Sequence, residues 1–211
     1  QGHILMKGKV TSADLMKEVL HRESGLRTGR LLSDVYLFDS PLPGDPRLLG
    51  ITDGGINLAP DLDAKAQILA NALDVFRTLG HEKPKVAILS AIETVNPDLP
   101  STVDAAELAR RAAEGAFGSG DVSGPLAMDL AVSEDAARKK GVETPVAGAA
   151  DVLLFPSIES ANIAAKTVQY MAGVEVGHVV VGAAAPVLIP SRSEDARAKT
   201  NAVALGRLMV G

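Results

Sequence analysis

The chain has 211 residues, 46% of them hydrophobic, which is enough to bury the core of one large domain or of two small ones. Because it contains no cysteine, disulfides, thiolate metal sites and a cysteine nucleophile are excluded. A net charge of -5 and an aromatic content of 3% argue against a nucleic-acid-binding surface, although a local basic cluster could still bind a small anion.

In chain order, short apolar runs alternate with longer segments of helical periodicity. The expected strands are residues 34–38, 48–52, 85–91, 151–155, 178–182 and 187–189. The expected helices are residues 12–22, 62–79, 101–116, 133–140, 160–172 and 194–209. Two of these helices follow capping signals, Thr11-x-x-Asp14 and Ser101-x-x-Asp104.

This alternation predicts an α/β fold. Strands that are joined through helices of ten or more residues form a mainly parallel sheet with helices on both faces. Residues 39–46, "DSPLPGDP", are expected to form a proline-rich surface turn. No apolar run approaches the roughly 20 residues that cross a bilayer, and no signal peptide opens the chain, so we expect a cytoplasmic protein.

Several familiar site signatures are missing. The glycines of "GSGDVSG", residues 118–124, miss the dinucleotide-binding spacing by one residue, so this segment is interpreted as a loop. Neither a Walker phosphate loop nor a G-x-S-x-G elbow occurs. The four histidines are scattered without the spacing of a metal site, and each is interpreted as a surface or packing residue.

Polar residues gather just after the expected strands, where open α/β sheets bind ligands. Each of them alone is better explained by a helix cap or a turn. Five such strand ends in one chain, with glycine and proline beside them, favour a ligand-lined cleft. The residues concerned are Asp53; Ser90, Glu93 and Asn96; Ser123 and Asp129; Glu159 and Asn162; and Ser191, Arg192, Glu194 and Asp195.

Seven segments together, in their order and spacing, resemble the phosphate acetyltransferase and phosphate butyryltransferase family, and the butyryl branch is the closer match. The resemblance covers essentially the whole chain. The segments are "LMKGKVTSADLMKEVL", "GLRTGRLLSDV", "ITDGGINLAPDLDAK", "PKVAILSAIETVNPDLPSTVDAAELAR", "GPLAMDLAVS", "PVAGAADVLLFPSIESAN" and "APVLIPSR".

The resemblance implies a reversible acyl transfer in which acyl-CoA and phosphate give acyl phosphate and CoA. It also implies two α/β domains around a cleft, similar to isocitrate and isopropylmalate dehydrogenases, and a homodimer. Coenzyme A and phosphate would be substrates, with no tightly bound cofactor, metal, nucleic acid or membrane partner.

Since members of the family are longer, we expect this chain to be a fragment. Residues 1–27 and 179–211 would be the remnant of a first domain, and residues 28–178 the second domain.

The chemistry of such a transfer needs no protein nucleophile, because phosphate and the CoA thiolate are nucleophiles themselves. The protein must align them, exclude water and stabilise the tetrahedral oxyanion. A carboxylate could take the thiol proton in the CoA-consuming direction, and an arginine could hold phosphate oxygens in a fork. A chain without cysteine is compatible with all of these requirements.

By the same resemblance, Ser191 and Arg192 match a catalytic Ser-Arg pair after the last strand. The polar end of the stretch "APVLIPSRSED", residues 185–195, is also expected to cap the last helix. Asp195 is the nearest carboxylate for the base, in competition with Glu194. The expected phosphate- and CoA-binding residues are Lys7, Thr11, Ser12, Lys17, Arg27, Asn162 and Lys166.

Three residues depart from the family pattern. Ser123 stands where the butyryl branch has an aspartate, Ala161 replaces a glycine before Asn162, and Lys17 replaces an arginine. These departures leave open a second hypothesis, a non-catalytic or truncated relative that serves in binding or assembly, or as part of a larger bifunctional protein or complex.

Overall fold

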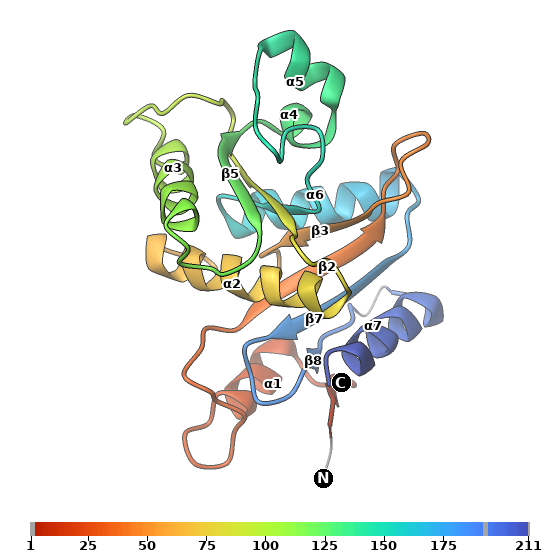
Figure 1. Ribbon diagram of the computed structural model, residues 1–211. Coiled ribbons are helices and arrows are strands. Elements are labelled where there is room, and N and C mark those ends of the chain that lie inside the picture. The colour runs from red at the N-terminus through yellow and green to blue at the C-terminus, as the bar shows by residue number, and fades with distance from the viewer. Residues whose placement is uncertain (1–2, 192–193, 211) are drawn as a thin grey trace.

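The computed structural model describes residues 3–191 and 194–210 (Figure 1). Its strands are β1 (Leu5–Met6), β2 (Ser33–Asp39), β3 (Leu48–Thr52), β4 (Lys85–Leu89), β5 (Asp121–Leu126), β6 (Val152–Leu154), β7 (Val176–Val181) and β8 (Val187–Leu188). Its helices are α1 (Ser12–Val19), α2 (Leu62–Thr78), α3 (Pro100–Ala113), α4 (Met128–Val132), α5 (Glu134–Lys140), α6 (Ile158–Met171) and α7 (Ala196–Leu208). In this part of the chain, no helix has both the length and the apolar character required to span a membrane.

The strands form one sheet in the order β1-β8-β7-β2-β3-β6-β4-β5. Four pairings are parallel, and the α/β class is therefore confirmed. The other three, β2 with β3, β2 with β7 and β7 with β8, are antiparallel. The proline-rich turn explains the first of these, because it connects β2 directly to β3 and is too short for the crossover that a parallel pair needs.

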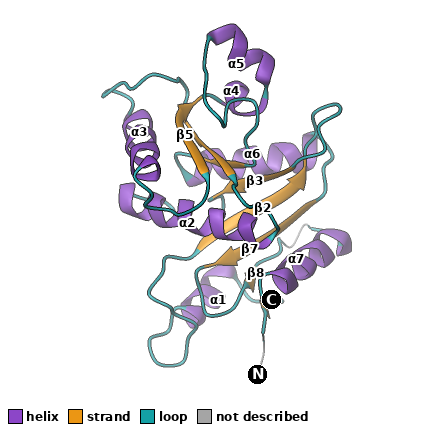
Figure 2. Cartoon of the chain, in the orientation of Figure 1, coloured by secondary structure: helices purple, strands orange, loops and turns teal. Residues whose placement is uncertain are grey.

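Helices lie on both sides of the sheet (Figure 2). The alternation of side chains along β2 divides the core between them. Val35 and Leu37 pack in one apolar cluster with α2, α3 and α7, whereas Tyr36 and Phe38 pack in another with α4, α5 and α6. A third, smaller cluster joins Val19 of α1 to β7 and β8. The Tyr36 side chain therefore lies on the α6 side of the sheet, where the candidate site is found.

Each expected strand and helix is present, with ends shifted by a few residues. The loop interpretation of residues 118–124 is wrong in its second half, because Asp121–Leu126 is β5 and pairs with β4. The short helix α4 was not expected.

The capping expectations had different outcomes. Thr11 caps α1 as predicted, since its hydroxyl oxygen accepts a hydrogen bond from the Asp14 backbone N–H at 3.1 Å. The Ser101 box is wrong: α3 begins at Pro100 without a side-chain cap, and Asp104 instead forms an ion pair with Lys65 at 2.6 Å.

The expected division into two domains stays a prediction. Strand β7 crosses the expected boundary at residue 178, and all six of its residues pair with β2.

Candidate functional site

A pocket of about 440 Å³ gathers residues from five distant segments of the chain on the α6 side of the sheet. The first segment, residues 7–12, runs from the end of β1 into the start of α1. The others lie on β2, after β3, on α6 and after β8. The pocket is lined by Lys7, Thr11, Ser12, Tyr36, Gly54, Gly55, Asn162, Lys166, Ile189 and Ser191. Two lysines and several hydroxyl and amide groups therefore face one space, which suits a small anion.

The start of α1 supplies one wall. The chain leaves β1 at Met6, and the Lys7 ammonium donates a hydrogen bond to the Ser12 hydroxyl at 3.0 Å. Thr11 caps the helix, so that its first turn and its positive end lie beside the lysine. The local capping signal in the sequence thus positions both polar residues and the cation.

Helix α6 supplies another part of the wall with Asn162 and Lys166, one helical turn apart. The Asn162 side-chain amide donates to the Gly54 carbonyl oxygen at 2.9 Å. A β-carbon on Gly54 would lie 3.3 Å from the Asn162 backbone nitrogen, so the glycine permits this close approach. Ala161 is fully buried in the core and does not line the pocket, so its departure from the family pattern leaves the approach intact.

The loop after β3 is held by the carboxylate of Asp53. It accepts hydrogen bonds from the backbone N–H groups of Gly55 at 3.0 Å, Ile56 at 3.1 Å and Asn57 at 3.0 Å. Burial and the nearby Asp34 raise the pKa of Asp53, although these donors partly offset the shift. Asp53 therefore shapes the segment that presents Gly54 and Gly55 to the pocket.

A buried charged cluster lies behind the pocket. The His178 imidazole is between two carboxylates, with Nδ1 3.4 Å from Asp34 Oδ1 and Nε2 3.6 Å from Glu194 Oε2. Its ring stacks on Tyr36 with centroids 4.6 Å apart, because these two residues are direct partners in the β2–β7 pairing. The Lys166 ammonium lies 4.0 Å from Glu194 Oε1 and links the cluster to the pocket wall.

Proximity to the carboxylates determines the protonation of this cluster. Burial by itself lowers the pKa of His178, but Asp34 and Glu194 together raise it from 6.5 to about 9. Burial tends to raise the pKa of Glu194, but His178 and Lys166 hold it below its ordinary value. Burial, together with Asp34, Glu194 and Asp53, raises the pKa of the Tyr36 phenol well above its usual range. At neutral pH the cluster therefore holds an imidazolium, ionised Glu194 and a neutral phenol.

The raised pKa of His178 predicts that stability falls in mildly alkaline solution. The stabilisation is complete below the unfolded pKa of 6.5 and is lost as pH rises through about 9. We expect the free energy of unfolding, measured by urea titration, to drop by up to about 3 kcal/mol between these limits. The His178→Gln variant should lack this part of the drop, and an identical pH dependence in both proteins would contradict the assignment.

The pocket brings together six of the ten residues predicted for the site: Lys7, Thr11, Ser12, Asn162, Lys166 and Ser191. Arg192 lies outside the described residues. Asp195 is exposed, and its carboxylate accepts a hydrogen bond from the Ala198 backbone N–H at 2.9 Å, so the stretch 185–195 caps α7, as predicted, through Asp195.

Lys17 and Arg27 do not line this pocket. Lys17 is two residues from the buried Val19, about 200° around α1, and points into solvent. Arg27 lines a neighbouring pocket of about 420 Å³ with Arg30 and Asn57. Of the five predicted strand ends, those near Ser90 and Ser123 also lie elsewhere: the Ser90 hydroxyl bonds to Ser101 of α3, and Ser123 is in β5.

Sequence reasoning missed the cluster behind the pocket. His178 was interpreted as a surface or packing residue, and Asp34 and Tyr36 were seen only as parts of a strand. The available signal was a buried strand, Val176–Val181, whose sequence "VGHVVV" contains a single titratable side chain. A charged or polar residue in such a strand usually has a partner.

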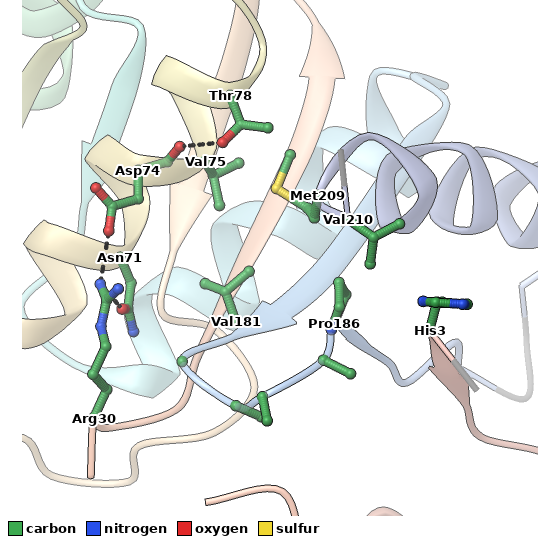
Figure 3. Close-up of a pocket in the computed structure, with 14 residues that line it drawn as sticks. His3, Arg30, Asn71, Asp74, Val75, Thr78, Val181, Pro186, Met209 and Val210 are labelled. Carbon is green, nitrogen blue, oxygen red and sulfur yellow. Dashed lines mark hydrogen bonds and ion pairs between the residues drawn. The ribbon is translucent and has the colours of Figure 1, made fainter. Parts of the chain in front are cut away.

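Another cavity, of about 500 Å³, lies beside α2 and the end of α7 (Figure 3). The Arg30 guanidinium lines this cavity and donates hydrogen bonds to Asn71 Oδ1 at 2.6 Å and to Asp74 Oδ2 at 2.8 Å. Since these bonds already engage Arg30, this cavity is less suited to an anion than the pocket between α1 and α6. Within the described residues, no group of three or more histidine and acidic side chains could hold a metal ion.

The family model described as phosphate acetyl/butaryl transferase matches residues 2–206. The chain belongs to this family. It is 41% identical to the phosphate acetyltransferase of Rhizobium meliloti, over 99% of this chain and 65% of that protein. It is 42% identical to the phosphate butyryltransferase of Clostridium acetobutylicum, over 99% of this chain and 68% of that protein. The chain thus spans about two thirds of the length of these relatives.

A solved structure supports the same assignment. The branched-chain phosphotransacylase from Enterococcus faecalis superimposes with a TM-score of 0.90 at 35% identity, covering 100% of this chain and 74% of that one. A phosphotransacetylase from Streptococcus pyogenes, at 22% identity and a TM-score of 0.82, shares the fold. Relatives named for acetyl and for butyryl transfer match to similar extents, so family membership leaves the acyl chain open.

Proposed function

We propose that this chain is a phosphate acyltransferase that moves a short-chain acyl group reversibly between coenzyme A and phosphate. The observation that carries the proposal is the pocket in which Lys7 and Lys166 face Ser191 and Asn162. Two ammonium groups that line one space suit a phosphate, and the hydroxyl and amide groups suit the carbonyl oxygen of an acyl group.

Each residue has a distinct task in this proposal. The two lysines hold phosphate oxygens and align the anion for attack on the thioester. Ser191, with Arg192 beside it in the sequence, stabilises the oxyanion of the tetrahedral intermediate. Neither candidate base faces the pocket directly, because the Glu194 side chain is 0% exposed behind it and the Asp195 carboxylate caps α7, so neither is assigned the thiol proton.

The rest of coenzyme A needs more space than this pocket provides. The neighbouring pocket that contains Arg27 and Arg30 is bounded by Ile56 and Asn57, directly after the glycines of the first pocket. We place the pantetheine arm across this loop, with the anionic end of CoA near Arg27. Arg27 then keeps its predicted role in CoA binding, at a distance from the acyl transfer.

The assay for this function is release of free CoA from butyryl-CoA, with and without phosphate, followed with a thiol reagent. We expect release that depends on phosphate, and the absence of cysteine means that the protein adds no thiol signal of its own. Acetyl- and propionyl-CoA measured in parallel would give the chain-length preference. A longer gene product that binds CoA but releases none in the presence of phosphate would favour a non-catalytic binding or assembly role.

The assembly and location belong to the same proposal. Coenzyme A and phosphate are the expected small-molecule ligands, with no tightly bound cofactor. We propose a homodimer of two-domain subunits, as the family resemblance implies, located in the cytoplasm. Light scattering during gel filtration measures the number of subunits directly.

A further inference from the structure

The pocket is proposed to bind an anion, yet buried carboxylates lie directly behind it. Within the described residues, three basic and three carboxyl side chains lie in and behind the pocket, together with the neutral phenol of Tyr36. The basic side chains are Lys7, Lys166 and His178, and the carboxyl ones are Asp34, Asp53 and Glu194. Removal of one positive charge would leave an excess of negative charge facing phosphate.

His178 is the cation of this set that water cannot reach. Its side chain is 3% exposed, and those of Asp34 and Glu194 are 0% exposed. Both carboxylate oxygens of Glu194 and Oδ2 of Asp34 are buried without a hydrogen-bond partner in the described part of the chain. Burying a carboxylate is costly unless a positive charge lies beside it, and the imidazolium lies beside both of these carboxylates.

Two contacts carry the state of His178 to the pocket. Its ring stacks on Tyr36, which forms part of the pocket wall. Glu194, on its other side, faces Lys166 of the pocket, and the Glu194 backbone N–H donates to the Ser191 carbonyl oxygen at 3.2 Å. The charge on the imidazole therefore acts on both walls although the ring itself is not in the pocket.

We propose that His178 is a positioning residue, an inference that rests on the proposed function. Its imidazolium lies between Asp34 and Glu194, balances the charge of the carboxylates behind the pocket and thereby permits phosphate binding. Loss of the proton leaves Asp34 and Glu194 without a shared counterion. Asp34 on β2 and Glu194 before α7 face His178 and favour its charged form. Tyr36 on β2 stacks on its ring, while Asp53 after β3 acts on Tyr36 and Lys166 on α6 faces Glu194.

The test measures the affinity of the chain for inorganic phosphate by calorimetry at pH 7.5. A unit charge just behind a bound anion changes its affinity by about tenfold at the effective dielectric of protein sites. We therefore expect His178→Gln to bind phosphate about tenfold more weakly. The matched control is His81→Gln, since His81 also faces a carboxylate, Asp151 at 3.7 Å, and also packs on an aromatic ring, that of Phe76. It should bind like the wild type.

A compensating variant separates charge balance from packing. In His178→Gln with Glu194→Gln, one positive and one negative charge are removed together, so the balance is restored while the stacking imidazole is still missing. We expect most of the lost phosphate affinity to return. Affinity in the double variant no better than in His178→Gln would overturn the proposal, as would unchanged affinity in His178→Gln itself.

The wild-type protein alone supplies a second measurement in case His178→Gln does not fold. Its phosphate affinity should fall about tenfold as the pH rises from 7.5 to above 9, because His178 loses its proton over this range. A constant affinity up to pH 9.5 would overturn the inference. If the proposed function itself were wrong, the wild type would neither bind phosphate at pH 7.5 nor release CoA. That result would overturn both, whereas normal binding that is insensitive to His178 would overturn this inference alone.

Discussion

Replacing Asp53 with alanine is expected to destabilise the chain by about 3 kcal/mol, because three backbone N–H groups lose their acceptor at once. Each orphaned donor costs about 1–3 kcal/mol when buried, and the partial exposure of this loop keeps the sum near the lower limit. Relief of repulsion with Asp34, which helps to raise the pKa of Asp53, offsets some of the loss. Urea unfolding measures the change.

The Asp53→Ala variant should also bind phosphate more weakly, because the loop that Asp53 holds presents Gly54 and Gly55 to the pocket. Asp61→Ala is the matched control. Asp61 also accepts a backbone N–H, that of Ala64 at 2.8 Å, but it only caps α2, so its loss should cost about 1 kcal/mol and leave the pocket unchanged. If the two variants lost equal stability, the loop-holding role of Asp53 would be wrong.

Local signals were sufficient for most of the fold. Helix α2 illustrates this: apolar residues recur at helical spacing from Ile68 to Val75, and Gly80 follows its end, so the expected range of 62–79 differs from Leu62–Thr78 by one residue. Strand β5 lacks such a signal. Its sequence "DVSGPL" contains Gly124, where a β-carbon would lie 2.8 Å from the Ile88 side chain, so this glycine serves close packing between strands and not a loop.

The candidate site was predictable where the family resemblance could be applied residue by residue, as for Lys7, Asn162 and Ser191. The cluster behind it was not, because Asp34 and His178 are 144 residues apart and meet only through the antiparallel pairing of β2 with β7. A sequence of alternating strands and helices does not tell which strands are neighbours or in what register they pair, so nothing in it places Tyr36 beside His178. The register of long-range strand pairs is the information that the local pattern lacks.

Replacing Arg192 with alanine is expected to lower kcat/KM for phosphate-dependent CoA release by roughly 10²–10³-fold, the usual effect of removing one donor that stabilises an oxyanion. Arg192 lies outside the described residues, so the expectation rests on its place in the sequence. It directly follows Ser191, which lines the pocket, and it matches the family's Ser-Arg pair. Arg192→Lys should recover only part of the rate, because a lysine keeps the charge but not the two-pronged contact with phosphate.

The control for Arg192→Ala is Arg197→Ala, five residues further along the chain. The Arg197 guanidinium is 74% exposed and pairs with Glu175 at 2.7 Å, an arrangement worth little at a protein surface. We expect its kcat/KM to stay within about twofold of the wild type. The split between kcat and KM then locates the role of Arg192: a loss in kcat places the guanidinium at the transition state, whereas a rise in the KM for phosphate alone places it in ground-state binding. Unchanged kcat/KM in Arg192→Ala would remove Arg192 from the site and leave Lys7 and Lys166 to hold phosphate without it.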